Sequence, residues 1–188
     1  MAVSAARRQD ERLSFTQVVT LHQKAVYGYL LRFTRNPHDA QDLFQDTFLR
    51  AQRAYAALPA DADLRAWLMR IAVNLSKNYA RDRQRRGRVL VDEEQGYGLD
   101  REFLAEAGTD MEGTMISRET ARTLLTTIEA LPFHQRAALI QRQFEGLDYH
   151  TIAANLGCSL ESARAHVYQA LRKLRLSLEH SDPDAKEV

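Results

Sequence analysis

Cysteine is nearly absent: the 188 residues include one, Cys158. A single thiol cannot form an internal disulfide or supply a multi-cysteine zinc site, and its place within a turn favours a packing role. Long apolar runs are absent too, and the first residues lack the apolar core of a secretory signal. We therefore expect a cytoplasmic protein without direct membrane insertion, in which residues 1–12 form a polar N-terminal tail.

Signals of catalysis are also missing. The six histidines form no metal-ligand spacing with one another or with Cys158. The chain has no glycine-rich phosphate loop, and no grouping of Ser, His and Asp can be placed. The sequence thus predicts a protein that is not an enzyme, with no catalytic residue, no metal site and no cofactor.

The composition that is present, 45% hydrophobic and 27% charged, is typical of a soluble globular protein. The net charge of +1 hides a strong asymmetry along the chain. Residues 1–88 carry a net charge of +8, residues 89–119 carry −7, and residues 120–188 are neutral. Such blocks indicate two modules joined by an acidic tether.

Three helices are predicted in the basic block. Ser14 begins the first as part of a capping box, and this helix runs to a break at Asn36 and Pro37. Asn36 can cap a second helix of about six turns that reaches Leu58, with Pro37 at its first position. After a short polar loop, a third apolar stripe begins at Leu64. The three stripes predict a helical bundle with a shared core.

Two polar surfaces lie on these helices. The second helix has an acidic edge, which fits either a solvated helix N-terminus or a docking surface for a basic partner. The third helix has a basic ridge, with six basic residues and one acid between positions 77 and 88. A polyanionic partner explains this ridge better than a solvated helix end does.

The acidic connector separates the two modules. Residues 89–116 hold four glycines and most of its acidic side chains without a sustained period, so we interpret them as a flexible linker. Helical periodicity returns over residues 117–179, where Pro132 separates the first two helices and Gly146 ends the second. Residues 180–188 are expected to form a C-terminal tail.

The stretch from Tyr149 to Arg175 predicts a helix-turn-helix. Asp148 can cap its first helix, Gly157 can end that helix in the left-handed conformation, and Ser159 can cap the second. The second helix presents base-reading residue types first and phosphate-binding types later, which suits insertion into a major groove. The alternative interpretation is an ordinary helix pair with a solvated basic end.

Three motifs, in this order along the chain, resemble the bacterial sigma factors of the extracytoplasmic-function (ECF) group of the sigma-70 family. They are DAQDLFQDTFLRAQRAY (39–55), LRAWLMRIAVNLSKNYARDRQRR (64–86) and the segment 131–175, which includes the helix-turn-helix. The resemblance implies an all-α fold of two small helical domains joined by a flexible acidic linker. Region 2 would be a three-helix bundle over residues 13–88, and region 4 a four-helix domain over residues 117–179.

The resemblance also implies a function and partners. Such a protein binds core RNA polymerase, recognises the minus-35 and minus-10 promoter elements, and starts transcription of a specific, stress-related set of genes. The implied partners are core RNA polymerase, promoter DNA and an anti-sigma factor. The alternative is an autonomous helix-turn-helix regulator that binds an operator and ignores the polymerase, and the acidic edge of the second helix distinguishes the two.

Residue by residue, the resemblance implies three binding sets. The core-polymerase set is Asp39, Asp42, Leu43, Gln45, Asp46 and Phe48. The minus-10 set is Asp61, Asp63, Asn74, Lys77, Asn78, Arg81 and Arg85. The minus-35 set is Glu161, Ser162, Arg164, Ala165, His166, Tyr168, Arg172, Lys173 and Arg175. Family members often have Ser, Arg and a basic residue where this chain has Ala165, His166 and Gln169, so the promoter sequence does not carry over.

Overall fold

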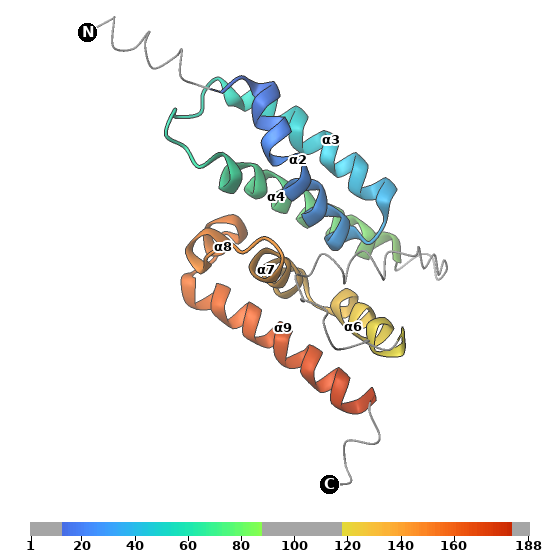
Figure 1. Cartoon of the computed structure of the whole chain (residues 1–188). Coiled ribbons are helices and arrows are strands. Elements are labelled where there is room, and N and C mark those ends of the chain that lie inside the picture. The colour runs from blue at the N-terminus through green and yellow to red at the C-terminus, as the bar shows by residue number, and fades with distance from the viewer. Residues whose placement is uncertain (1–12, 88–117, 182–188) are drawn as a thin grey trace, which may run out of the picture. The chain divides into compact units, whose positions relative to one another are not determined.

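The computed structural model describes residues 13–87 and 118–181, and these residues form seven helices and no strand (Figure 1). This confirms the predicted all-α fold. The expected tails and the linker over residues 89–116 lie outside the described residues. Among the helices of the described ranges, none is long and apolar enough to cross a membrane.

The chain divides into two compact units, Met1–Ser76 and Lys77–Val188. The division falls inside the third helix, after Ser76, the last buried residue described in that helix. The predicted domain bounds, which place the first boundary after residue 88, stay a prediction.

The first unit contains α2 (Phe15–Thr34), α3 (Pro37–Tyr55) and the part of α4 (Leu64–Gly87) that ends at Ser76. The predicted capping box is present: the Ser14 hydroxyl accepts from the Gln17 amide, and the Gln17 side chain accepts from the Ser14 amide. The Asn36 side chain accepts from the amides of residues 38 and 39 and caps α3. These side chains supply partners for amides that a helix start leaves unpaired.

The α3 helix is shorter than the sequence predicts. It ends at Tyr55, and the segment to Leu58 forms tight turns in which the Leu58 amide donates to the Tyr55 carbonyl. The apolar period therefore continues for three residues after the helical hydrogen bonds have ended. Periodicity detects which side chains share a face, but it does not detect where a helix tightens into a turn.

Aromatic rings tie the three helices of the first unit together. Phe15 of α2 lies against Phe48 and Tyr55 of α3, with ring centroids 6.4 and 5.5 Å apart. Tyr55 in turn lies 6.4 Å from Trp67 of α4, and its hydroxyl donates to the Leu13 carbonyl. Trp67 is half-buried and packs in this cluster, as expected of a core residue.

The second unit is built around its last helix. Its elements are α6 (Arg118–Ala130), α7 (Phe133–Gln143), α8 (Tyr149–Leu156) and α9 (Leu160–Ser181), and α9 packs against the other three. Buried Ala153 and Ala163 allow α8 and α9 to approach closely. The core also includes Ile128, Leu131, Leu139 and Ala170, with Leu174 packed against it.

The turn between α8 and α9 follows the sequence prediction closely. The Asp148 carboxylate accepts from the Thr151 amide at 2.9 Å and caps α8, and Gly157 ends α8 with a φ of 65°. The Ser159 hydroxyl accepts from the Ser162 amide at 3.1 Å where α9 begins. These local interactions fix the helix-turn-helix.

A buried polar bond connects α7 to α8. The Asn155 side-chain amide donates to the Gln141 side-chain oxygen at 2.8 Å, and the Gln141 amide donates to the Ala137 carbonyl at 3.1 Å. Both side chains are almost fully buried. Losing either partner would leave a buried polar group unpaired, so this bond favours one arrangement of the two helices.

We expect Gly157→Ala to destabilise the second unit by about 1–2 kcal/mol, because a Cβ is disfavoured at positive φ. The space around Gly157 is open, so strain rather than a clash sets the effect. Trp67, the only tryptophan of the chain, lies in the first unit. In urea unfolding of Gly157→Ala, the transition seen by far-UV circular dichroism should shift to lower urea concentration. The transition seen by Trp67 fluorescence should keep its midpoint.

An exposed residue of α8 supplies the control for this substitution. Ala154→Ser should change the unfolding free energy by less than about 0.5 kcal/mol. Equal stability of Gly157→Ala and the wild type would contradict the role given to the left-handed turn.

Candidate nucleic-acid interface

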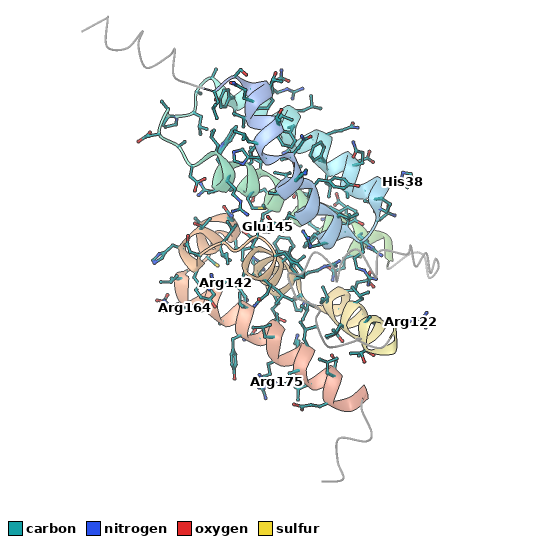
Figure 2. The ribbon with its side chains drawn as sticks, in the orientation of Figure 1. His38, Arg122, Arg142, Glu145, Arg164 and Arg175 are labelled. Atoms are coloured by element: carbon teal, nitrogen blue, oxygen red, sulfur yellow. The ribbon has the colours of Figure 1, made fainter. Side chains whose placement is uncertain are left out.

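The outer face of α9 brings most of the predicted minus-35 residues together. Seven of them are exposed, namely Glu161, Arg164, Ala165, Tyr168, Arg172, Lys173 and Arg175. Tyr168 is 68% exposed, which is unusual for a large aromatic ring without a partner surface. Arg164 near the start of α9 and Arg175 toward its end can be followed in Figure 2. The exposed face of α9 therefore carries an aromatic side chain, Tyr168, between the cationic side chains of Arg164 and Arg175.

Two positions of α9 contact the first turn of α7 instead. The rings of His166 and His134 are stacked with centroids 5.3 Å apart, and the Gln135 side-chain amide donates to the Gln169 side-chain oxygen at 2.7 Å. His166 is half-buried as a result. These contacts could not be predicted from the sequence, because nothing local marks His134 and Gln135 as partners of residues about thirty positions later.

A second set of contacts that sequence reasoning missed surrounds Tyr149, the first residue of α8. The guanidinium carbon of Arg142 lies 4.9 Å from the centre of the Tyr149 ring, and that of Arg164 lies 5.8 Å from it. Arg142 also donates to the Leu147 carbonyl at 3.0 Å. Both distances lie within the range of cation–π attraction.

The α3 helix carries the predicted core-polymerase set. Asp42, Gln45 and Asp46 are exposed along one edge, and Asp39 and Leu43 are half-buried beside them. The remaining residue, Phe48, is 8% exposed and packs on Phe15 and Phe44, so it supports this edge from within the core. Leu49, which was not predicted, is 51% exposed and lies seven residues, about two helical turns, after Asp42 on the same edge.

The predicted minus-10 set lies on the loop before α4 and along α4 itself. Its α4 members are exposed and recur at three- and four-residue steps: Asn74, Lys77, Asn78, Arg81 and Arg85. The loop residues Asp61 and Asp63 are exposed as well, and Asp63 has a structural task because its carboxylate accepts from the Ala66 amide at 3.0 Å. Asp63 therefore helps to fix the point at which α4 leaves the loop.

Among the residues that the structure describes, four titratable groups have clearly shifted pKa values. Burial, followed by the nearby Arg65, lowers the pKa of His22, while Asp63 opposes that shift. Burial, followed by the neighbouring His166, lowers the pKa of His134. Hydrogen bonds from Thr151 lower the pKa of Asp148, and burial raises the pKa of the Cys158 thiol. A thiol with a raised pKa stays protonated at neutral pH and is a weak nucleophile.

No group of three or more metal-ligating side chains is found within residues 13–87 and 118–181. The surfaces with a clear chemical character are therefore those of α3, α4 and α9. They present one acidic edge, one basic ridge and one helix-turn-helix face.

Comparison with known proteins assigns these surfaces to a family. Residues 18–86 match sigma-70 region 2, and residues 121–174 match sigma-70 region 4. The chain is 32% identical to the RNA polymerase sigma-H factor of Pseudomonas aeruginosa over 94% of this chain and 92% of that protein. It is 30% identical to the ECF RNA polymerase sigma-E factor of Haemophilus influenzae over 87% of this chain and 86% of that one.

The chain belongs to the ECF RNA polymerase sigma factors. Two solved structures have the same fold as this ECF sigma factor. One is the sigma factor RpoE of Bartonella quintana in complex with the anti-sigma factor NepR, with a TM-score of 0.64, 22% identity, and coverage of 88% of this chain and 96% of that one. The other is CnrH in complex with the cytosolic domain of CnrY, with a TM-score of 0.64, 22% identity, and coverage of 96% and 97%.

The lowered pKa of His134 makes the stability of the second unit of this ECF sigma factor depend on pH. The unfolded chain binds the proton more tightly than the folded one, so the free energy of unfolding should fall as pH drops below about 6.5. His134→Phe keeps a ring against His166 but removes the titrating group. The free energy of unfolding, measured in urea at pH 7.5 and 5.5, should differ less between the two pH values in this variant than in the wild type. Equal differences in the two proteins would contradict the lowered pKa of His134.

Proposed function

We propose that this ECF sigma factor is a dissociable promoter-specificity subunit of RNA polymerase. It docks on the core enzyme through α3, reads the minus-10 element through α4 and its preceding loop, and reads the minus-35 element through α9. Catalysis belongs to the polymerase, and the complex works in the cytoplasm. The observation that carries the proposal is the outer face of α9, where Arg164, Tyr168 and Arg175 are exposed on a helix whose other face is buried.

Different parts of α9 contact the bases and the phosphates of the minus-35 element. Arg164 stands in the first turns, where a recognition helix enters the major groove and meets base edges. Arg172, Lys173 and Arg175 follow two to three turns later, about 12–16 Å along the axis, where the helix passes the phosphates. Tyr168 between them presents an apolar ring, the kind of surface that contacts a thymine methyl group.

The minus-10 element is held by the ridge of α4. Its amide and cationic side chains alternate on one exposed face, which suits a strand whose bases are separated from their partners. The loop residues Asp61 and Asp63 lie at the entrance to this ridge. Because Asp63 caps α4, it couples the shape of the loop to the start of the helix.

The core polymerase contacts the acidic edge of α3. Asp42, Gln45 and Asp46 are exposed in successive turns, and Leu49 extends the edge with an apolar side chain. An acidic edge ending in an exposed leucine fits a basic helical surface with a small apolar pocket. We propose that the same protein is held inactive by an anti-sigma factor, since one structural neighbour is a sigma factor in complex with an anti-sigma factor and the other, CnrH, is in complex with the cytosolic domain of CnrY.

Gel filtration with core RNA polymerase, followed by transcription from candidate promoters, tests the proposal. Co-elution and transcription that requires the added protein are expected. A stable homodimer that does not co-elute with polymerase, yet protects an operator from nuclease, would favour the autonomous regulator instead.

The acidic edge should contribute measurably to core binding. We expect Asp42→Asn combined with Asp46→Asn to weaken binding to core polymerase about tenfold, or about 1.4 kcal/mol, and to reduce its salt dependence. Competition of the unlabelled variant against labelled wild type measures this effect. Glu179→Gln, an exposed carboxylate near the end of α9, is the control, and an equal effect of both changes would argue against specific docking.

Arg164 and Lys173 should behave differently on promoter DNA. Arg164→Ala should cost about 1–3 kcal/mol, concentrated at one position of the minus-35 element. Lys173→Ala should weaken binding evenly across sequences and lower the salt slope of log K by about one. Holoenzyme binding to a set of single-base promoter variants at several salt concentrations separates the two, and an even loss from Arg164→Ala would exclude its base-reading role.

A further inference from the structure

Arg164 is exposed on α9, and its guanidinium lies near an aromatic ring of another helix. It lies 5.8 Å from the centre of the Tyr149 ring, which belongs to α8, the first helix of the helix-turn-helix. The same ring is approached by Arg142 of α7 at 4.9 Å, and both arginines can be followed in Figure 2. One aromatic ring thus connects three helices of the unit at the point where α9 would enter DNA.

The ring is held in place by its surroundings. Tyr149 is half-buried and is the first residue of α8, where the Asp148 carboxylate fixes the backbone through the Thr151 amide and hydroxyl. Arg142, which also approaches the ring, is anchored because it donates to the Leu147 carbonyl at 3.0 Å. A tyrosine side chain has two rotatable bonds, so few contacts are needed to immobilise it.

An exposed arginine samples many rotamers, and a bidentate contact to a base edge uses one narrow set of them. Attraction to a fixed aromatic face reduces the set that Arg164 samples before DNA arrives. The ordering cost at binding is then smaller, and the planar guanidinium starts from a defined place. The effect acts on geometry and leaves the charge of the interface unchanged.

We propose that Tyr149 is a positioning residue that holds Arg164 ready to read one base of the minus-35 element, with Arg142 fixing the ring from the other side of the turn. The inference rests on the proposed function, and within it makes α8 a determinant of specificity. Its consequence is distinctive: loss of the ring lowers base discrimination but leaves the number of phosphate contacts unchanged.

The test compares Tyr149→Leu with Tyr149→Phe in the full-length chain bound to core polymerase. Phenylalanine keeps the aromatic face and removes the hydroxyl, whereas leucine removes the face. Tyr149→Leu should lower discrimination about two- to fivefold at the position identified by Arg164→Ala, with an unchanged salt slope. Tyr149→Phe should match the wild type, and Tyr149→Leu should have no further effect in the Arg164→Ala background.

A measurement on the free protein keeps the inference testable if Tyr149→Leu folds poorly. In the wild type, the side-chain protons of Arg164 should show upfield ring-current shifts by nuclear magnetic resonance, and Tyr149→Phe should preserve them. Arg164 resonances at the positions of an exposed arginine in both proteins would overturn the proposal.

Three binding results would also overturn it. An equal loss at every promoter position would assign Tyr149 a structural role only, and a loss with Tyr149→Phe would assign its hydroxyl a direct contact with DNA. A gain in discrimination with Tyr149→Leu would mean that the ring holds Arg164 away from the base. If Arg164→Ala lowers base discrimination at no promoter position, the base-reading role of Arg164 is wrong and this inference is wrong with it. Co-elution with polymerase tests the proposed function separately.

Discussion

The second unit depends on one constraint: α9 must bury one face and expose the other. Ala163, Val167 and Ala170 are almost fully buried against the preceding helices, which fixes the rotation of α9 about its own axis. Each residue is offset by about 100° from the last, so a rotation that exposed Ala170 would bury Arg164 or Tyr168. The apolar stripe therefore determines which side chains the helix presents.

Contacts outside the apolar stripe of α9 set the positions of the neighbouring helices. The buried bond between Gln141 and Asn155 sets α7 against α8, and the glycine turn sets α8 against α9. These two links, one tertiary and one local, place Tyr149 of α8 near Arg164 of α9. The exposed charged side chains of α9 are in this way positioned by uncharged contacts on α7 and α8.

Most of the fold could be predicted from sequence because its signals are local. Capping side chains at Ser14, Asn36 and Asp148 and the glycine at 157 lie within a few residues of the helix ends that they determine. The contacts that were missed join residues far apart in sequence, such as His134 with His166. Phe48, which the resemblance places in the core-polymerase set, lies on the apolar stripe of α3 and is buried against Phe15 of α2.

His166 and Gln169, two positions where the resemblance implies a departure from the residues common in the family, both contact the first turn of α7. A cation at position 169 could not accept from the Gln135 amide as Gln169 does, because Lys and Arg side chains have no acceptor. The side chains at positions 166 and 169 thus pack against α7, and changing either one would alter a contact with that helix. In the proposed function, promoter preference therefore depends on contacts from α7 and α8 as well as on the residues of α9.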